Sequence, residues 1–400
     1  MKFKVLELFG GIGACSKALE RIGVDYEIAD YVEIDKYAVK SFNAIHNTNF
    51  EPQDVCEWDK DIKVDLLMHG SPCQDFSVAG LQKSGDKGSG TRSSLMWETI
   101  RIVEKIKPKY VIWENVKNLL SKKHIHNFNA YLETMKNLGY TNYYQVLNAK
   151  NYGIPQNRER VFTISIRNDI DKGYTFPEPQ ELKLKLKDML EDEVDEKYYI
   201  SEDRSKQLIN DLQNKKTLML DVCRYKRDWK DPRLIQVGVL NIKGQDIVKR
   251  VYFEEGLCPT LTNMQGGNRQ PKVIGGVREN INNITLKSKC KRLSSLVNKI
   301  VFKKGKVLNM DLYNQTTNEN VSQCLTEPHH NSQRLFDGLR IRKLTPKECW
   351  RLMGFDDEDF EKAAKVNSNA QLYKQAGNSI VVNVLVNIFT NLLGGVTNEK

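Results

Sequence analysis

The stretch Val5-Leu6-Glu7-Leu8-Phe9-Gly10-Gly11-Ile12-Gly13 decides the fold class of this 400-residue chain. A short apolar run, Val5–Phe9, stops at a turn that contains three glycines. Helical spacing of apolar residues follows over Ser16–Ile22, and Gly23 is a suitable stop for that helix. A strand, a glycine turn and a helix in this order are typical of α/β domains that bring backbone amides close to a bound molecule.

The alternation of strands and helices continues to about residue 170. Further strands are expected over Tyr26–Ile34, Val64–Met68 and Tyr110–Trp113. Further helices are expected over Lys36–His46, Leu95–Ile106 and Asn127–Leu138. This alternation predicts an α/β fold with a doubly wound, Rossmann-like parallel sheet and helices on both faces. The segment Leu81–Ser94 breaks the pattern, and a long connection of this kind favours a functional loop.

The pattern changes after Arg167, where a proline-containing linker begins. Short strand-like pieces separated by Gly and Asn follow, at Leu234–Leu240, Ile247–Phe253 and Lys299–Phe302. Helical spacing returns at Thr345–Met353 and Ser379–Leu393. We therefore expect an α/β body over 1–170, a smaller, irregular, strand-rich domain over 171–340, and a return segment over 341–400 that completes the body.

Positive charge is concentrated in the middle of the chain. Between Arg204 and Lys306 there are 23 Lys and Arg against 8 Asp and Glu, whereas the rest of the chain has a small negative excess. A regional excess of this size is expected where a protein holds a polyanion such as nucleic acid. A solvated basic face without a partner is the alternative, and charge alone does not decide between them.

Several classes of protein are disfavoured by the same sequence. No apolar run is long enough to cross a bilayer, because the nearest candidate, Ile380–Leu393, is interrupted by three asparagines. The N-terminus enters the first strand pattern without a cleavable signal. The eight cysteines form no C-x-x-C pair, so neither a structural zinc site nor a disulfide framework is expected. We expect a cytoplasmic protein with no metal and no membrane partner.

The glycine turn and a following acid indicate the kind of cofactor. The third glycine of the dinucleotide fingerprint is missing, because Gly11 and Gly13 are followed by Ser16, which argues against a pyrophosphate at the helix start. Glu33 ends the next strand 20 residues beyond Gly13, where an acid commonly binds ribose hydroxyls. A cofactor with a ribose and no phosphate fits best, and S-adenosylmethionine is the obvious one. A structural turn with a surface glutamate remains the alternative.

Two further elements fall at the same edge of the predicted sheet. Cys73 follows Pro72 just past a predicted strand, and a nucleophilic cysteine needs such an exposed position. Glu114 and Asn115 stand just past the strand Tyr110–Trp113, where a carboxyl group is suited to act as an acid. A nucleophile, an acid and a cofactor turn therefore converge where α/β sheets bind their ligands.

With these residues in place, the chain resembles the DNA (cytosine-5)-methyltransferases of bacterial and phage restriction-modification systems. The matching stretches are Leu8-Phe9-Gly10-Gly11-Ile12-Gly13, Gly70-Ser71-Pro72-Cys73-Gln74, Glu114-Asn115-Val116, Gln156-Asn157-Arg158-Glu159-Arg160, Arg342–Phe355 and Gln375-Ala376-Gly377-Asn378-Ser379. The resemblance runs in order along nearly the whole chain. The region 171–340 falls where this family keeps its variable target-recognition region, and Pro259-Thr260-Leu261-Thr262 is similar to a Thr-Leu pair often found there.

The resemblance implies methyl transfer from S-adenosylmethionine to carbon 5 of a flipped-out cytosine in a specific duplex DNA sequence, through a covalent Cys73 adduct. The implied catalytic residues are Cys73, Glu114, Arg158 and Arg160. The implied cofactor-binding residues are Phe9, Gly11, Gly13, Glu33, Asp54, Pro72, Leu95 and Asn378. The loop Leu81–Ser94 is expected to close over the flipped base, and the last helix to pack back on the body. We expect a monomer that binds double-stranded DNA, with a companion restriction endonuclease of the same specificity as a further possible partner.

Two alternatives to this function stay open at this point. A tRNA cytosine-5 methyltransferase of the same fold is opposed by the large basic insert and by the absence of Cys-Phe-Thr after Val116, where that branch tends to carry it. A catalytically silent DNA-binding protein of the same fold is opposed by the intact Pro72-Cys73 pair and Glu114. A nicotinamide-dependent dehydrogenase is disfavoured by the missing third glycine.

Overall fold

Strand β1 (Phe3–Leu8) lies between β2 and β3 in the main sheet. The computed structural model describes residues 2–72, 95–201, 203–205, 208, 233–264, 269–275, 310–311, 316–317 and 340–394. The strands of the main sheet follow the order β2-β1-β3-β4-β7-β5. Their bounds are β2 (Tyr26–Val32), β3 (Leu66–His69), β4 (Tyr110–Val116), β5 (Tyr140–Asn148) and β7 (Glu159–Arg167).

The direction of these strands shows where a ligand is expected. Strands β1, β2, β3 and β4 are parallel, whereas β7 is antiparallel to both β4 and β5. Strand β1 pairs with β2 on one side and with β3 on the other, so the strand order reverses next to β1. Open α/β sheets bind ligands at such a switch point, beyond the carboxyl ends of the strands. In this chain that edge carries the glycine turn after β1, Glu33 after β2 and the Gly70–Pro72 turn after β3.

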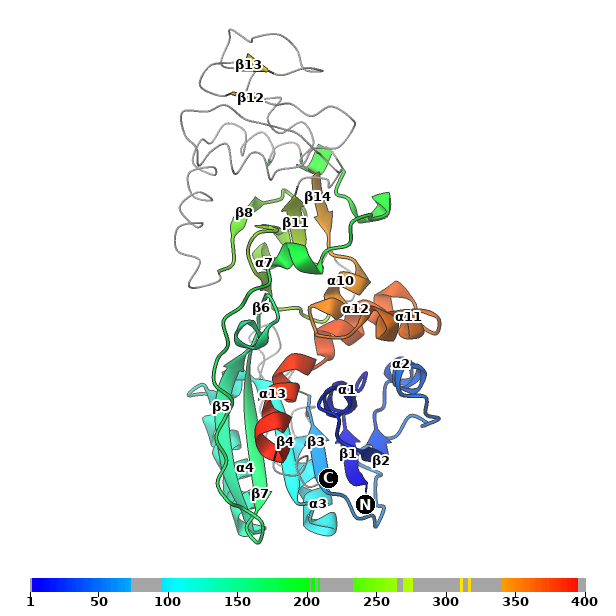
Figure 1. The fold of residues 1–400 in the computed structure, drawn as a ribbon, viewed down its shortest axis with the longest axis vertical. Helices are drawn as coiled ribbons and strands as arrows, with labels where there is room; N and C mark the ends of the chain where they lie inside the picture. The colour runs from blue at the N-terminus through cyan, green and yellow to red at the C-terminus, as the bar shows by residue number, and fades with distance from the viewer. Residues whose placement is uncertain are drawn as a thin grey trace. The chain divides into compact units, whose positions relative to one another are not determined.

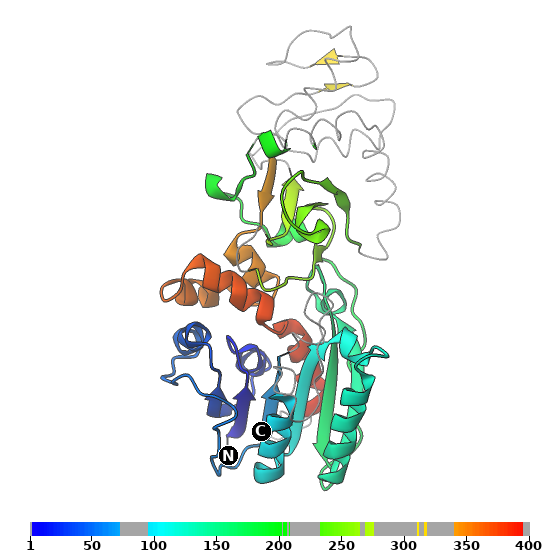
Figure 2. The ribbon, with the colours of Figure 1, turned by 180° about the vertical axis from the view of Figure 1, so that it is seen from behind.

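Helices cover both faces of this sheet. Figures 1 and 2 show α3 (Met96–Ile106) and α4 (Ile125–Asn137) on one face, and α1 (Ala14–Arg21) and α13 (Val382–Leu393) on the other. The remaining helices that contribute to this part are α2 (Lys36–His46), α10 (Pro346–Arg351), α11 (Asp357–Ala364) and α12 (Asn369–Asn378). The expected doubly wound α/β fold is therefore confirmed, and α13 packs against α1.

Local sequence explains why α2 forms where it does. Asp35 caps its start by accepting a hydrogen bond from the Tyr37 amide, and Asn47 ends it in the left-handed conformation. Between these caps, buried residues follow helical spacing, at Ala38, Val39, Ser41, Phe42 and Ile45. The bounds predicted for this helix, Lys36–His46, are those of the structure.

The far side of the sheet differs from the purely parallel arrangement that we expected. Strands β5 and β7 are joined by the 3₁₀ turn η3 (Ala149–Tyr152) and the short strand β6 (Gln156–Asn157). This connection is too short for a crossover helix, so β7 returns antiparallel to β5. Because β7 also pairs along β4, β4 continues through Glu114 to Val116 instead of ending at Trp113.

The described parts of Lys185–Pro259 and Gly266–Glu348 belong to a second compact unit. It holds a four-stranded sheet in the order β14-β11-β9-β8, with a core that includes Val237, Val251, Ile274 and Ile341. Its strands are β8 (Gln236–Val239), β9 (Arg250–Phe253), β11 (Lys272–Gly275) and β14 (Arg340–Lys343), and shorter elements are η4 (Leu186–Met189), η5 (Glu196–Tyr198), β10 (Cys258–Pro259), β12 (Met310–Asp311) and β13 (Thr316–Thr317). The expected strand Ile247–Phe253 is a helical turn, α7 (Asp246–Lys249), followed by β9. The expected strand Lys299–Phe302 lies outside the described residues.

The boundaries of the two units differ from those expected at 170 and 340. The first unit comprises the described parts of Met1–Leu184, Thr260–Gln265 and Cys349–Lys400. Residues just after 170 stay with this unit because the Tyr152 hydroxyl donates to the Pro177 carbonyl at 2.9 Å. Strand β14 stays with the second unit, where Arg342 and Glu348 form a buried ion pair at 2.6 Å. The functional division of the chain stays a prediction.

Within the part of the chain that the structure describes, one stretch meets the length and hydropathy criteria for a membrane span. Asn369–Leu393 has a mean hydropathy of 1.4 over its best window, which is more apolar than we expected of any stretch. In the structure this stretch consists of α12 and α13, and 56% of that window is buried inside the protein. This is weak evidence for a membrane span, because core helices of soluble proteins pass the same test.

Candidate functional site

The glycine turn after β1 has a backbone conformation in which most other residues would be strained. Gly11 and Gly13 have φ of 56° and 81°, and Phe9 shares this left-handed region with a φ of 54°. A Cβ placed on Gly13 would lie 2.2 Å from the His46 ring, and one on Gly10 would lie 2.6 Å from the Tyr31 ring. A non-glycine residue at positive φ, such as Phe9, is typical of binding loops. The turn is therefore specified by close packing as well as by backbone conformation.

Glu33 contacts the glycine turn directly. The Gly11 amide donates to Glu33 Oε2 at 3.1 Å, and the Asp35 amide donates to Oε1 at 2.9 Å. The Tyr31 hydroxyl donates to the Gly11 carbonyl at 2.7 Å, which joins the end of β2 to the same turn. Burial raises the pKa of Glu33, although these backbone hydrogen bonds oppose the increase. The structure thus brings Phe9, Gly11, Gly13 and Glu33 together, as predicted.

The start of α1 is occupied by a carboxyl group of the chain itself. The Ser16 amide donates to Glu7 Oε1 at 3.0 Å, and the Ser16 hydroxyl donates to the same oxygen. Glu7 is buried, and burial raises its pKa from the ordinary value of 4.5 to about 7, although the Ser16 hydrogen bonds oppose the increase. Ser16 stands where dinucleotide-binding proteins have their third glycine. An amide that such proteins offer to a phosphate is therefore already used inside this chain.

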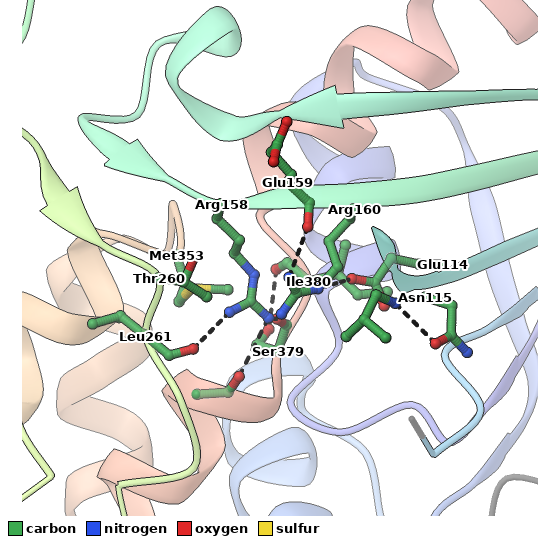
Figure 3. Close-up of polar contacts among 12 residues, drawn as sticks. Glu114, Asn115, Arg158, Glu159, Arg160, Thr260, Leu261, Met353, Ser379 and Ile380 are labelled. Carbon is green, nitrogen blue, oxygen red and sulfur yellow. Dashed lines mark hydrogen bonds and ion pairs between the residues drawn. The ribbon is translucent and has the colours of Figure 1, made fainter. Parts of the chain in front are cut away.

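Glu114 lies at the same sheet edge, in strand β4. Glu114 is 8% exposed, and its Oε1 atom lies 3.0 Å from Arg160 Nε, in an ion pair that lacks standard hydrogen-bond geometry (Figure 3). Strand β3 ends opposite Trp113, so Glu114 projects beyond the end of its neighbour. A Cβ placed on Gly70 would lie 3.8 Å from Glu114 Oε2. The turn that leads to Cys73 therefore runs beside this carboxyl group.

The residues just before Cys73 are held by β4. Trp113 Nε1 donates to the Ser71 hydroxyl at 3.0 Å, and Asn115 Nδ2 donates to the Ser71 carbonyl at 3.4 Å. The Trp113 ring stacks on His69, with centroids 5.6 Å apart and planes 6° apart. Burial lowers the pKa of His69 to about 3, so the stacked imidazole is neutral at physiological pH. Cys73 itself and the loop Leu81–Ser94 lie outside the described residues.

The two arginines predicted to be catalytic have different partners. Arg160 lies against Glu114, whereas Arg158 is 4% exposed and donates to backbone carbonyls. These carbonyls belong to Leu261, Gly377 and Ser379, at 2.8, 3.3 and 2.8 Å (Figure 3). The structure thus brings Arg160 to the predicted acid and gives Arg158 a set of backbone contacts that we did not expect.

The remaining predicted cofactor residues are Asp54, Pro72, Leu95 and Asn378. Asp54 accepts a hydrogen bond from the Cys56 amide at 2.9 Å, and the preceding Gln53 amide donates to the Glu33 carbonyl at 2.9 Å. Pro72 and Leu95 are half-buried at the two limits of the undescribed segment 73–94. Asn378 is exposed at the last residue of α12.

Helix α12 is fixed to α2 near the same edge. Lys374 Nζ lies 2.6 Å from Asp35 Oδ2, and the Ser41 hydroxyl donates to Gln375 Oε1 at 2.9 Å. The return segment therefore reaches the end of β2, where Glu33 lies. Among the described residues, no group of three or more His, Cys, Asp or Glu side chains is arranged to hold a metal ion.

Sequence reasoning missed several residues that build this site. Ser71 and Trp113 each stand next to a motif residue that we singled out, and Gln156 lies within a matched motif. Ile34 follows Glu33 directly, and its apolar side chain is 69% exposed. The position of Ile34 directly after Glu33 could have marked it as a site residue. Its exposure could not be foreseen, because we expected the strand Tyr26–Ile34 to include it.

Comparison with known proteins agrees with this geometry. The sequence profile of the C-5 cytosine-specific DNA methylases matches residues 3–394. The chain belongs to this family. It is 36% identical to an orphan methyltransferase of Bacillus phage SPbeta, over 100% of this chain and 99% of that protein. It is 30% identical to the type II methyltransferase M.HhaI of Haemophilus parahaemolyticus, over 97% of this chain and 94% of that protein.

Solved structures support the fold. The crystal structure of the S. pombe Dnmt2 methyltransferase aligns with a TM-score of 0.58 at 17% identity, over 99% of each chain. The expected enzyme class, a DNA cytosine methyltransferase of the restriction-modification type, is confirmed by the family and its members. The SPbeta relative is described as an orphan methyltransferase, so the comparisons give no support for a companion endonuclease.

Proposed function

We propose that this enzyme transfers a methyl group from S-adenosylmethionine to carbon 5 of a flipped-out cytosine in a specific duplex DNA sequence, through a covalent adduct with Cys73. The observation that carries the proposal is the position of the Glu114–Arg160 pair. It lies beside the turn that leads into Cys73, at the sheet edge that also holds Glu33 and the glycine turn. An acid and a nucleophile next to a cofactor site are what this reaction requires.

The residues present fit S-adenosylmethionine better than a dinucleotide. A Cβ on Gly11 would meet no atom within 4 Å, so there is open space beside the Glu33 carboxylate, which can accept hydrogen bonds from ribose hydroxyls. Glu7 already accepts the Ser16 amide at the start of α1, so this donor is not available to a phosphate. Ile34 offers exposed apolar surface beside Glu33 for the face of a nucleobase. When bound there, S-adenosylmethionine supplies an electrophilic methyl group.

We propose that the residues predicted from the sequence to bind the cofactor are the ones that contact S-adenosylmethionine. The backbone of Phe9, Gly11 and Gly13 lines the site at the glycine turn, and Glu33 holds the ribose. Asp54, Pro72, Leu95 and Asn378 complete the list of proposed cofactor-binding residues.

The chemistry on the base is assigned to this chain's own side chains. Cytosine carbon 5 is a poor nucleophile, so the Cys73 thiolate forms a bond to carbon 6, and the displaced electron pair moves toward ring nitrogen 3. Glu114 stabilises that nitrogen with a proton, and Arg160 holds Glu114 in place. Carbon 5 then bonds to the methyl carbon, whose bond to the donor's sulfonium sulfur breaks. The carbon-5 proton passes to water, and departure of the Cys73 thiolate from carbon 6, with return of the nitrogen-3 proton to Glu114, restores the ring. The cytosine must leave the duplex, because carbon 6 cannot be reached by a thiol within the base stack.

Duplex DNA is assigned to the basic region between Arg204 and Lys306. Its excess of Lys and Arg is suited to phosphate contacts, which position a protein on DNA, and to base contacts, which give specificity. We propose that this region belongs to a target-recognition domain over 171–340, and that the enzyme acts as a monomer in the cytoplasm.

Methyl transfer to DNA tests the proposal directly. Purified protein is incubated with S-adenosylmethionine labelled in its methyl group and with duplex DNA, and bisulfite sequencing then identifies the modified base and its sequence context. We expect Cys73→Ser to abolish transfer while it retains DNA binding, and Cys56→Ser, at an exposed cysteine, to keep full activity. We expect Glu114→Gln to lower the rate by about 100-fold or more, in the range of general acid catalysis. Glu159→Gln, at the exposed neighbour of Arg160, is the matched control.

The alternatives are outcomes of the same assay. Transfer to tRNA in preference to duplex DNA would support a tRNA methyltransferase. DNA binding without transfer by the wild-type protein would support a catalytically silent protein. Full turnover by Cys73→Ser would refute the covalent route.

A further inference from the structure

The segment that begins at Thr260 belongs to the first unit, although in sequence it interrupts the second. The Leu261 amide donates to Gln156 Oε1 at 3.2 Å, and the Leu261 carbonyl accepts from Arg158 Nη1 at 2.8 Å. The Thr260 hydroxyl donates to the Asn157 carbonyl at 2.6 Å. Both backbone polar groups of Leu261 are thus bound by side chains that come just before β7.

The same two side chains also hold the C-terminal segment. Arg158 Nη2 donates to the carbonyls of Ser379 at 2.8 Å and Gly377 at 3.3 Å, and Gln156 Nε2 donates to the Leu352 carbonyl at 2.8 Å. Figure 3 shows the Arg158 guanidinium between Leu261 and Ser379. A planar guanidinium with several fixed donors is suited to bridging two strands of chain in one geometry.

Close packing at Gly377 is independent evidence for the same contact. A Cβ placed on Gly377 would lie 2.0 Å from the Thr262 carbonyl oxygen and 2.9 Å from the Asn263 amide nitrogen. These are backbone atoms, which cannot rotate away as a side-chain tip can. Glycine at this position therefore allows the end of α12 to touch the 260–263 segment.

We propose that Gln156 and Arg158 are positioning residues that clasp the segment 260–262 to the end of α12. Arg160, two residues after Arg158, binds Glu114. The clasp therefore fixes the positions of the segment 260–262 and of the end of α12 relative to the Glu114–Arg160 pair. This inference rests on the proposed function. It also replaces the catalytic role expected of Arg158 by a positioning role, because Arg158 acts through backbone carbonyls.

Kinetics separate positioning from chemistry. We expect Arg158→Lys to raise KM for DNA by about tenfold or more, because one ammonium cannot replace three charge-assisted hydrogen bonds. The single-turnover rate constant at saturating DNA and cofactor should change less than about threefold, because Arg158 does not touch the reacting atoms. Gly377→Ala should give the same pattern from the other side of the contact. Glu159→Gln is the control that should leave both values unchanged.

A double variant and a milder one keep the test falsifiable. Arg158→Lys and Gly377→Ala disrupt one contact, so their combined effect on KM should be clearly smaller than the product of the single effects. Thr260→Val removes one hydroxyl with little change in shape, and should raise KM about threefold. Hydrogen exchange at the Leu261 amide should accelerate in all three variants without any assay of activity.

Three results would overturn the proposal. The first is a loss of single-turnover rate in Arg158→Lys that matches Arg160→Lys, with KM unchanged, because this would make Arg158 a catalytic residue. The second is an effect on KM in the double variant that equals the product of the effects of Arg158→Lys and Gly377→Ala. The third, decisive if Arg158→Lys does not fold, is a folded Thr260→Val protein with wild-type KM and wild-type exchange at Leu261. If the wild-type protein transfers no methyl group, the proposed function fails, whereas the exchange measurement still tests the clasp.

Discussion

Replacing Trp113 by Phe tests whether β4 holds the turn that precedes Cys73. The indole is buried and packs against His69 and Tyr131, whose ring centroids lie 5.6 and 4.2 Å from its own, and its N–H donates to the Ser71 hydroxyl at 3.0 Å. Phenylalanine keeps an aromatic ring in this place and removes the donor. Ser71→Ala removes the acceptor instead, so the pair forms a double-mutant cycle.

The expected magnitudes follow from burial. Ser71→Ala leaves the indole N–H without its partner, which costs about 1–3 kcal/mol. Trp113→Phe leaves the Ser71 hydroxyl without this donor and creates a cavity, at a cost of about 2–4 kcal/mol. The double variant has neither polar group, so its loss should be about 1–2 kcal/mol smaller than the sum of the two single losses.

The free energy of unfolding is measured by urea titration with near- and far-ultraviolet circular dichroism. The transition of the first unit is fitted separately, because a chain with two units need not unfold in one step. Methyl transfer gives a second readout: we expect Trp113→Phe to lower the single-turnover rate about tenfold, since small misplacements of reacting groups are costly. Stability losses that add within about 0.5 kcal/mol would show that the hydrogen bond contributes nothing to holding the turn.

Three other predictions concern the glycine turn and its acids. Glu33→Gln should weaken the binding of S-adenosylhomocysteine about tenfold in calorimetry, because a charged acceptor is lost; unchanged affinity would remove Glu33 from the cofactor site. Gly13→Ala, at a φ of 81° and with a Cβ 2.2 Å from His46, should lower the free energy of unfolding by about 2 kcal/mol or more in urea, and wild-type stability would contradict the strain. Glu7, with its pKa raised from 4.5 to about 7, binds a proton in the folded state that the unfolded chain has lost. Its contribution to stability therefore falls by about 3 kcal/mol as the pH rises through that window, so Glu7→Gln should gain on the wild type between pH 5 and pH 8, whereas an equal difference in urea midpoints at both pH values would contradict the raised pKa.

The parts of the site with strong local signals could be predicted from the sequence. The glycine turn has a backbone that few other residues adopt, and Glu33 follows it at a spacing that the parallel sheet dictates. Helix α2 has a cap at each end and a regular apolar face, so its bounds were correct. The position of Glu114 past a predicted strand was a usable signal for an acid at this edge, but its ion pair with Arg160 is visible only in the structure.

The parts that depend on distant contacts could not be predicted. Strand β4 extends past Trp113 because β7, more than forty residues later, pairs with it, and no periodicity near Trp113 reports that partner. The carbonyl partners of Arg158 lie at Leu261 and Ser379, and a backbone carbonyl has no sequence signature at all. The limits of the two compact units differ from the expected boundaries for the same reason, because they are set by packing and not by a change in composition.

The insertion of Thr260–Gln265 into the first unit restricts how this enzyme can be recombined. A chimera that exchanges the whole stretch from 185 to 348 with a relative would also replace the Thr262–Asn263 backbone that packs on Gly377 and the Leu261 carbonyl that Arg158 binds, so a segment with a different backbone path would not match either residue. Two separate grafts, one ending at Pro259 and one starting at Gly266, avoid that mismatch. New sequence specificity can therefore be transplanted in two pieces around a short native bridge.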